Sequence, residues 1–375
     1  MDVPLDGSCD RRFLSVRDAF ATNFATGADV GASVAVVHRG ELVVDLWGGF
    51  VDQERSTPWQ QDTITNVWSC TKTMTSLVAH LLADRGELDL GAPVGRYWPE
   101  FAQNGKEGVL VSHVMAHSAG LPGWDEPMSA TDLYDWEATC AKLARQRPWW
   151  DPGTASGYHV LTQGYLLGEI VRRITGVSFG TFVAKEVTGP LGVDFHVGLA
   201  DEHIGRVANV IAPPPPTPPD PIPPFLMRMV GNPPLSAEQC WDHAWRRAEI
   251  PAANGHGNAR SLALCQAVVS CHEVNGTKLL SRAATASIFQ QHADGPDVVN
   301  GLPLRFGVGY ALSSPGLGFS VGPRACFWGG WGGSLVVNDL DTETTMAFVM
   351  NKMGGGTVGD ERAYRLLAAT QAAVE

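Results

Sequence analysis

Strand-like runs stand at both ends of this chain and are missing from its middle. Near the N-terminus, residues 32–50 (ASVAVVHRGELVVDLWGGF) place two β-branched runs around His38-Arg39-Gly40-Glu41, which predicts a β-hairpin with Gly40 in the turn. Three further runs lie near the C-terminus, at residues 306–312, 333–339 and 344–352. Because strands need neighbours for their backbone hydrogen bonds, we expect both ends to share one antiparallel sheet.

The middle of the chain, residues 90–255, has a different pattern. It is rich in Pro, Gly and Trp around stretches of helical periodicity such as 132–145 and 161–174. Its proline-rich loop, residues 212–224, cannot form a regular helix or a central strand because proline lacks the backbone N–H. We therefore predict an α+β fold that forms a single catalytic unit over residues 1–375. An antiparallel sheet flanked by helices makes an α/β subdomain from residues 1–89 and 256–375, and residues 90–255 make a mainly helical subdomain.

Charge and composition exclude several classes of function. The net charge is −12 and the basic residues are scattered, so the positive surface that nucleic acid requires is missing. The N-terminus, MDVPLDGSCDRRF, lacks the basic start and apolar run of a signal peptide, and no apolar stretch is long enough to span a bilayer. Seven dispersed cysteines without a C-x-x-C pair indicate reduced thiols. We expect a soluble, cytoplasmic protein without membrane or nucleic-acid partners; the sequence does not fix its oligomeric state.

A serine precedes a lysine by three residues in Ser69-Cys70-Thr71-Lys72. With 20 serines and 6 lysines in the chain, random placement gives about 0.3 such pairs, so the spacing alone proves little. Helical periodicity runs from Ser69 to Gly86 and puts the serine at or just before a helix N-terminus. Residues i and i+3 share one face of a helix, so Lys72 can reach the Ser69 hydroxyl. If burial lowers the pKa of Lys72, the lysine can act as a base.

Two distant segments carry groups that suit the same chemistry. Tyr158, in DPGTASGYHV, follows a turn-rich stretch and can share the serine proton with Lys72 if the lysine charge stabilises its phenolate. In FWGGWGGSLVVND, glycines at 329, 330, 332 and 333 lead into a strand. Such glycines let a backbone approach a ligand and present an N–H to an oxyanion. Taken singly, Tyr158 suits a half-buried aromatic with a satisfied hydroxyl better than a catalytic group, and the glycines equally suit a bulge at the start of a strand.

Three short motifs follow one another along the chain: S-C-T-K, then Y-H-V, then W-G-G. Their order resembles that of the three motifs of the serine β-lactamase and penicillin-binding protein superfamily. Within this superfamily, they are most similar to the class C-like branch and its family VIII carboxylesterases. Four other stretches are similar as well, namely GVLVSHVMAHSAGLPGW, PGTASGYHVLTQGYLLGEIVRRITG, NGHGNARSLA and FVMNKM. The resemblance covers roughly residues 15–370. It implies a β-lactamase/transpeptidase-like fold and no metal or organic cofactor.

The resemblance also implies a role for each matched residue. Ser69 becomes the nucleophile, Lys72 its proton partner and Tyr158 the general base or proton shuttle. The backbone N–H groups of Ser69 and Trp331 become the oxyanion hole. Trp328, Gly329 and Gly330 occupy the substrate-binding motif.

This chain departs from class C β-lactamases at two motif positions. It has Val160 where they have Asn, and Trp328-Gly329-Gly330 where they have Lys-Thr-Gly. The motif lysine helps to hold a substrate carboxylate, whereas an indole has no charge and donates one hydrogen bond. We therefore expect anionic β-lactams and peptide C-termini to bind poorly, and neutral apolar esters to be accepted.

The expected function is a serine carboxylesterase for neutral, short-chain acyl esters, whose partner is a small-molecule ester. Three alternatives remain open: a β-lactamase, D-amino-acid amidase or peptidase that uses the same residues, acyl transfer to another alcohol, and a catalytically silent binding protein. Retention of Ser69, Lys72 and Tyr158 together argues against a silent protein, since binding alone needs none of them.

Three other features suggest different chemistry, and we rank each of them lower. Ala116-His117-Ser118-Ala119-Gly120 approximates the G-x-S-x-G elbow of α/β-hydrolases, but it lacks the expected strand before it and helix after it. We interpret Ser118 as structural. Cys70 has no neighbouring His or paired Cys, which favours a packing role. His113 and His117 lack a third candidate ligand, so no metal site is expected.

Overall fold

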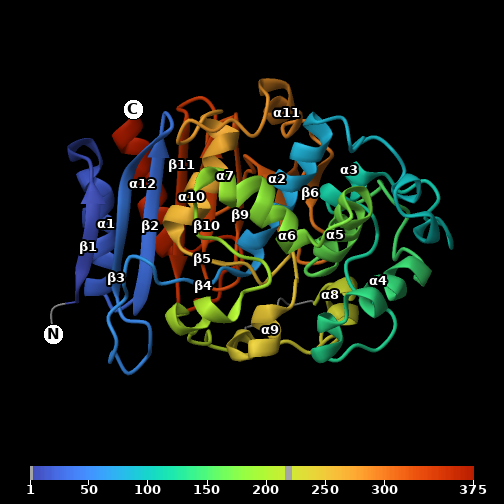
Figure 1. The fold of residues 1–375 in the computed structure, drawn as a ribbon, viewed down its shortest axis with the longest axis horizontal. Coiled ribbons are helices and arrows are strands. Elements are labelled where there is room, and N and C mark those ends of the chain that lie inside the picture. The colour runs from blue at the N-terminus through green and yellow to red at the C-terminus, as the bar shows by residue number, and fades with distance from the viewer. Residues whose placement is uncertain (1–2, 216–221) are drawn as a thin grey trace.

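The computed structural model describes residues 3–215 and 222–375. A large sheet with helices on both faces forms one side of the molecule, and a group of helices around α4 and α5 forms the other (Figure 1). The strands are β1 (Leu5–Cys9), β2 (Gly31–His38), β3 (Glu41–Gly49), β4 (Thr65–Asn66), β5 (His256–Gly257), β6 (Ala293–Pro296), β7 (Pro303–Phe306), β8 (Ala311–Leu312), β9 (Ala325–Gly329), β10 (Leu335–Asp339) and β11 (Thr344–Met350).

Both ends of the chain contribute to one antiparallel sheet, as the sequence predicts. Its order is β1-β3-β2-β11-β10-β9-β8-β7-β6, so the N-terminal hairpin pairs with the C-terminal strands through β2 and β11. Arg39 and Gly40 form the hairpin turn with φ of 52° and 83°, the left-handed conformation that a two-residue hairpin turn requires. The predicted α+β class is confirmed.

The predicted strand over residues 306–312 is wrong in its centre. β7 ends at Phe306 and β8 begins at Ala311, with a turn between them. Gly309 has a φ of 87°, and a side chain at Gly307 would collide with the carbonyl oxygen of Ile288. The two glycines therefore bend a run that periodicity alone describes as continuous.

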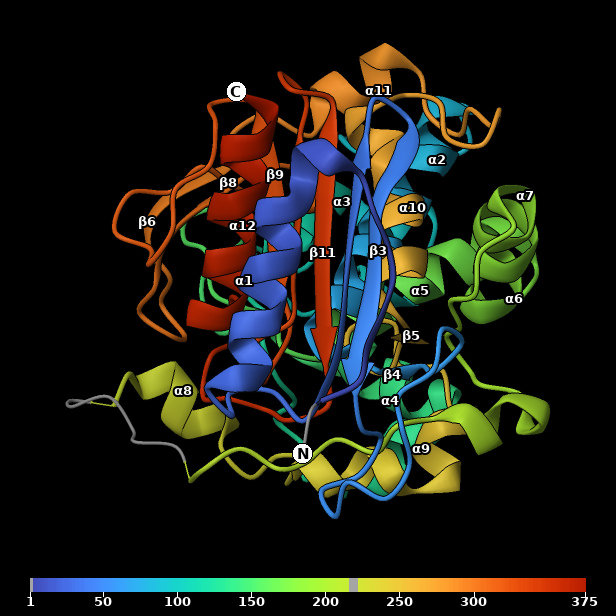
Figure 2. The same ribbon diagram turned by 90° about the vertical axis from the view of Figure 1, so that its left-hand side faces the viewer.

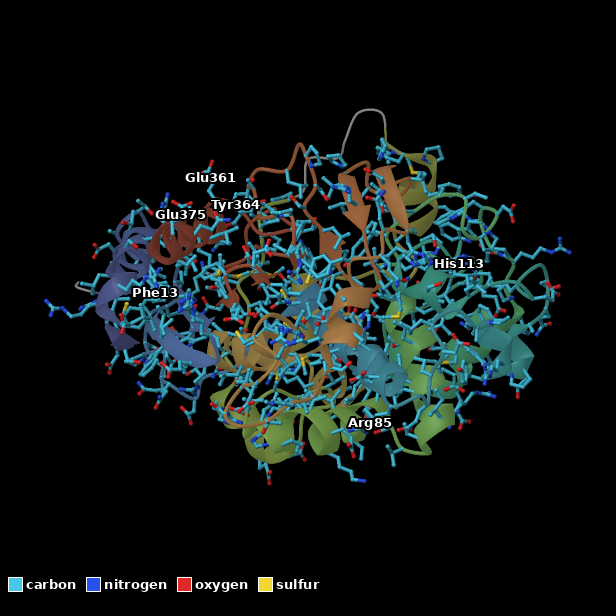
Figure 3. The ribbon with its side chains drawn as sticks, turned by 90° about the horizontal axis from the view of Figure 1, so that it is seen from above. Phe13, Arg85, His113, Glu361, Tyr364 and Glu375 are labelled. Atoms are coloured by element: carbon cyan, nitrogen blue, oxygen red, sulfur yellow. The ribbon has the colours of Figure 1, made fainter. Side chains whose placement is uncertain are left out.

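Alternate residues of the central strands face two separate cores. Val34 and Phe348 pack with α1 and α12 on one face, and Ala35 and Val349 pack with α2 and α10 on the other. In Figure 2, α1 and α12 lie side by side in front of the sheet. From above, Figure 3 shows Phe13, Tyr364 and Glu375 at this end of the molecule and His113 at the opposite end. The helices are α1 (Leu14–Ala25), α2 (Thr71–Asp84), α3 (Val111–Met115), α4 (Trp136–Arg145), α5 (Thr162–Thr175), α6 (Phe179–Val183), α7 (Gly189–Leu191), α8 (Pro224–Met229), α9 (His243–Arg247), α10 (Ala259–Ser270), α11 (Arg282–Ser287) and α12 (Glu361–Val374).

The elements between residues 90 and 255 are helical in the part of this stretch that the structure describes, from η3 (Val94–Arg96) to α9. The exact subdomain boundaries stay a prediction. Within the proline-rich loop, residues 212–215 form neither helix nor strand, residues 216–221 lie outside the described residues, and α8 begins at Pro224. None of the helices in the described ranges combines the length and apolarity needed to cross a bilayer.

Candidate active site

Ser69 lies in the short 3₁₀ helix η2 (Trp68–Cys70), which leads directly into α2. Val67 N–H holds the turn to a distant segment by donating to the carbonyl of Gly255, and Thr71 Oγ1 closes the turn itself by donating to the carbonyl of Trp68. Trp68 has a φ of 49°, a strained conformation for a tryptophan. Ser69 remains half-buried while both its neighbours are buried. The turn therefore presents one hydroxyl at the end of a rigid helix.

Lys72 lies one helical turn further on, with its amine in contact with this hydroxyl. Its Nζ is 3.2 Å from Ser69 Oγ and also donates to the carbonyl oxygens of Val160, at 2.7 Å, and Ala252, at 2.9 Å. The side chain is buried and forms no ion pair with the described residues. Removal from water lowers the pKa of Lys72 well below its ordinary value.

All three contacts of Lys72 Nζ are with oxygen atoms. An uncharged amine has two N–H donors and one lone pair, whereas an ammonium has three donors. As an ammonium, Lys72 donates to Ser69 Oγ and to the carbonyls of Val160 and Ala252; once it has lost a proton, the two carbonyls still use both N–H donors and the lone pair can face Ser69 Oγ. In this state, Lys72 is arranged to accept the serine proton.

Tyr158 reaches the same hydroxyl from the segment before α5. Its phenol O–H donates to Ser69 Oγ at 2.6 Å, and Lys72 Nζ lies 4.8 Å from the centre of its ring. Burial raises the pKa of Tyr158, while its contacts with Ser69 and Trp328 act in the opposite direction. The resting phenol therefore keeps its proton. The structure thus brings together Ser69, Lys72 and Tyr158, three residues that the sequence separates by up to 89 positions.

The end of β9 lies against the turn that carries Ser69. A side chain at Gly330 would come within 2.4 Å of the Val67 carbonyl oxygen, and one at Gly329 would meet the backbone of Val358 at the same distance. Only glycine allows β9 this close to both segments. Among the described residues, neither Ser69 N–H nor Trp331 N–H has a protein acceptor, as a pair of donors for an oxyanion requires. Their assignment to an oxyanion hole stays a prediction.

Trp328 lies inside the molecule rather than on the floor of an open cleft. Its side chain is 6 % exposed and its ring stacks on His117 with the ring centres 5.4 Å apart. Phe306 and Tyr158 contact the same indole, with ring centres 5.7 and 5.5 Å away. Within the described ranges, the indole N–H has no hydrogen-bond partner. Its predicted role in substrate binding, like that of Gly329 and Gly330, is not tested by this geometry.

Trp331 and Trp68 form the other aromatic side of the site. Trp331 is half-buried and meets Trp68 nearly edge to face, with ring centres 4.9 Å apart. Trp68 in turn contacts Trp245, whose indole N–H donates to the Asn66 side chain. This row of rings places apolar surface directly beside the Trp331 N–H.

The residues that suggested other chemistry, Ser118, His117 and Cys70, have surroundings that differ from those of Ser69. Ser118 is buried in the loop after α3, where its hydroxyl is 3.3 Å from the carbonyl of His113. His117 is buried and its Nδ1 accepts the N–H of His159. Burial, helped by His159 and Lys72, lowers the pKa of His117. Burial raises the pKa of the Cys70 thiol, so this cysteine stays protonated. All seven cysteines are free thiols.

Sequence reasoning missed the carbonyl groups that hold Lys72. Val160 was noted only as a departure from a motif, yet its backbone oxygen accepts from the lysine amine. Ala252 was not singled out. Backbone carbonyls occur at every position, so no residue type signals their role. Only the fold shows that these two segments converge on Lys72.

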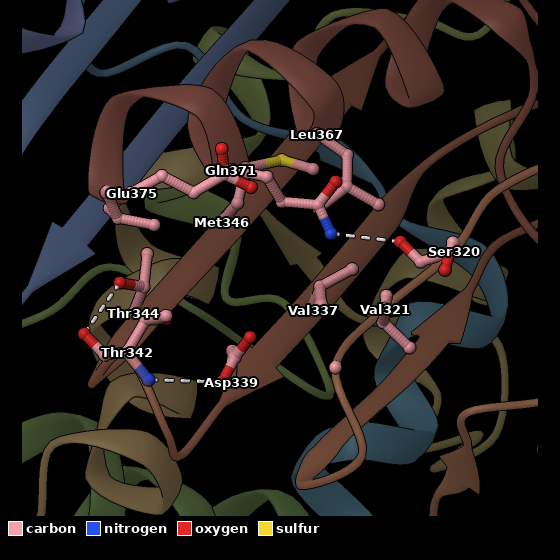
Figure 4. A pocket seen from close by; sticks show the side chains of 12 residues that line it. Ser320, Val321, Val337, Asp339, Thr342, Thr344, Met346, Leu367, Gln371 and Glu375 are labelled. Carbon is pink, nitrogen blue, oxygen red and sulfur yellow. Dashed lines mark hydrogen bonds between the residues drawn. The ribbon is translucent and has the colours of Figure 1, made fainter.

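A separate cavity of about 380 Å³ lies between α12 and the outer face of β10 and β11 (Figure 4). Val337, Met346 and Leu367 supply its apolar wall. Gln371 closes one side by donating from its side chain to the carbonyl of Ser320 at 2.9 Å. None of the predicted site residues lines this cavity.

Comparisons with known proteins identify the family of this chain. The family model described as Beta-lactamase matches residues 17–371. Esterase/beta-lactamase LipL of Mycobacterium tuberculosis is 34% identical over 380 residues, covering 92% of this chain and 83% of that protein. A crystal structure of a family VIII carboxylesterase superimposes with a TM-score of 0.93 at 39% identity, covering 99% of this chain and all of the other. A crystal structure of a penicillin-binding protein homologue from Caulobacter crescentus superimposes with a TM-score of 0.91 at 36% identity, covering 99% of this chain and 100% of the other. The predicted family is confirmed, and the chain belongs to the beta-lactamase family of serine hydrolases.

Proposed function

We propose that this protein is a carboxylesterase that hydrolyses neutral, short-chain acyl esters through an acyl-enzyme on Ser69. One observation carries the proposal: Ser69 Oγ lies between a buried amine at 3.2 Å and a phenol O–H at 2.6 Å. A serine hydroxyl needs a base within hydrogen-bond reach to become a nucleophile, and the neutral amine of Lys72 meets that need.

The reaction begins when Ser69 Oγ attacks the ester carbonyl while its proton passes to Lys72 Nζ. The carbonyl oxygen becomes an oxyanion, and the N–H groups of Ser69 and Trp331 receive it. Tyr158 then gives its proton to the departing alcohol, and Lys72 returns a proton to Tyr158. The ammonium of Lys72, 4.8 Å from the Tyr158 ring centre, stabilises the phenolate between these two transfers. Water releases the acid by the same steps in reverse.

The surroundings of the site support a neutral substrate. Trp328 stands where the family's β-lactamases carry a lysine, so that position offers no charge to a substrate carboxylate. The indoles of Trp331 and Trp68 supply apolar surface. The names of relatives also support ester hydrolysis: LipL is called an esterase and beta-lactamase, and a protein of Burkholderia gladioli that matches 44% of this chain is called esterase EstB.

Turnover of p-nitrophenyl butyrate by the wild type and by Ser69→Ala tests this function. We expect Ser69→Ala to lose at least about a thousandfold in kcat, because a serine nucleophile has no substitute at that place. An unchanged rate in this variant removes Ser69 from the mechanism. Ser118→Ala is the matched control and is expected to keep its activity.

A second function, β-lactam hydrolysis, is favoured by the relatives named beta-lactamase, among them one from Escherichia coli that is 30% identical over 43% of this chain. Nitrocefin, an anionic β-lactam, distinguishes the two. We expect kcat/KM for nitrocefin to be far below that for p-nitrophenyl butyrate. Comparable values make β-lactam hydrolysis the better description of the site.

A further inference from the structure

The indole N–H of Trp328 is a buried donor without an acceptor among the residues that the structure describes. It belongs to a side chain that is 6 % exposed, and leaving such a group unpaired carries a cost. The indole faces the phenol of Tyr158, with ring centres 5.5 Å apart and planes inclined by 50°. Its N–H favours the ionised form of this phenol. The unpartnered indole therefore packs beside a phenol that the proposed mechanism ionises.

The indole is held in this orientation by other rings. His117 stacks on it at an angle of 20°, and Phe306 contacts both His117 and the indole. His117 is itself fixed, because its Nδ1 accepts the backbone N–H of His159 at 3.1 Å. This packing keeps Trp328 from turning to another partner.

A hydrogen bond from the Trp328 indole would stabilise the neutral phenol of Tyr158 only weakly. Tyr158 O–H is directed at Ser69 Oγ, and the neutral oxygen is a modest acceptor. Once Tyr158 has lost its proton, the same oxygen becomes a buried anion and a strong acceptor. Lys72 faces it from α2, while the carboxylate of Asp297 acts against the charge. A second hydrogen-bond donor beside Lys72 stabilises Tyr158 most in this phenolate form.

We propose that the Trp328 indole N–H donates a hydrogen bond to the Tyr158 phenolate while the alcohol leaves. The proposal rests on the esterase function above and makes Trp328 a positioning residue rather than a substrate contact. In that step, the C–O bond of the tetrahedral intermediate breaks and its electron pair stays on the alcohol oxygen. This oxygen takes the proton of Tyr158, and the phenolate is later reprotonated by the Lys72 ammonium.

Two esters with the same acyl group and different leaving groups test the proposal. Ethoxide must be protonated to leave, whereas p-nitrophenolate leaves without a proton. In Trp328→Phe, which keeps a ring but lacks the N–H, we expect kcat/KM to fall about tenfold for ethyl butyrate, corresponding to one hydrogen bond to a charged group. For p-nitrophenyl butyrate, we expect a fall of less than about threefold. kcat/KM reports acylation alone, so the shared deacylation step does not interfere.

Equal losses on both esters, or no loss on either, overturn the proposal. Equal losses point to a structural or substrate-contact role for the indole. Trp59→Phe is the matched control, since Trp59 is also buried with an unpartnered indole N–H but packs against Gly31; both rates should stay at the wild-type level. Trp328→His restores a ring N–H and should keep the ratio of the two rates closer to wild type, which serves as the test if Trp328→Phe does not fold. Loss of activity in Ser69→Ala is independent of all these outcomes, so either proposal can fail alone.

Discussion

At the scale of single residues, the proposed mechanism depends on the protonation state of Lys72. The lysine must be neutral to accept the serine proton, and burial lowers its pKa from the ordinary value of about 10.4. Activity should therefore fall as the pH drops through this lowered pKa, because the ammonium form accumulates. Lys72→Arg keeps a cation that cannot lose its proton and should lose at least about a hundredfold in kcat/KM at every pH. A pH profile of p-nitrophenyl butyrate hydrolysis measures both effects.

Lys106 provides the matched control for this experiment. It is also buried, and its amine donates to the carbonyls of Gln103 and Gln146. Burial lowers the pKa of Lys106 to about 8. Lys106→Met should lower the melting temperature and leave the pH profile of activity unchanged. A shifted profile in this variant, or an active Lys72→Arg enzyme, contradicts the assignment of Lys72 as the base.

At the scale of elements, the proposed oxyanion hole requires β9 and η2 to lie in contact, so that the N–H groups of Trp331 and Ser69 are close together. Gly330→Ala places a methyl group within 2.4 Å of the Val67 carbonyl oxygen, so one segment must move. We expect kcat to fall at least about tenfold with a smaller change in KM, because an oxyanion donor acts mainly in the transition state. Gly108→Ala is the control: nothing lies within 4 Å of the added methyl, and the φ of Gly108 is not positive. If Gly330→Ala keeps the wild-type kcat, the close contact does not matter for catalysis.

The element scale also shows how far the sequence can predict. Ser69 and Lys72 lie on neighbouring turns, so their spacing alone predicted the contact that is seen. The position of Tyr158 depends on long-range packing, and only the family resemblance indicated its partner. β1, with the sequence LDGSC, was missed because it has no β-branched residue and is held as an edge strand by pairing with β3. Residues 306–312 were overpredicted because periodicity does not register the bend at Gly307 and Gly309.

At the scale of the whole molecule, Arg362 joins segments from both ends of the chain. From the start of α12, its guanidinium contacts Asp29 before β2, at 2.7 Å, the carbonyl of Lys352 after β11, and the carbonyl of Gly332 next to Trp331. Arg362→Ala leaves the Asp29 carboxylate buried without its partner, which costs about 3–5 kcal/mol. We expect a lower melting temperature together with a lower kcat.

The loss of stability in Arg362→Ala should depend on pH. Burial raises the pKa of Asp29 to about 6 even though Arg362 lowers it. Because this folded-state pKa lies above the unfolded value, the carboxyl's contribution to stability declines as the pH rises toward and past 6. Without Arg362 the pKa rises further, so the deficit measured by urea unfolding should be larger at pH 8 than at pH 5. Arg247→Ala, which breaks an exposed pair with Asp201, should leave the stability nearly unchanged at either pH. Equal deficits at both pH values for Arg362→Ala contradict this account.

The two carbonyl oxygens that hold the Lys72 amine have a kinetic consequence. The proposed mechanism pairs an uncharged base with a neutral ester, so their encounter should involve no long-range electrostatic steering, and the surrounding protein shields the reacting atoms from counter-ions. Ordinary salt concentrations should therefore leave the rate of ester capture unchanged, although the chain as a whole is strongly acidic.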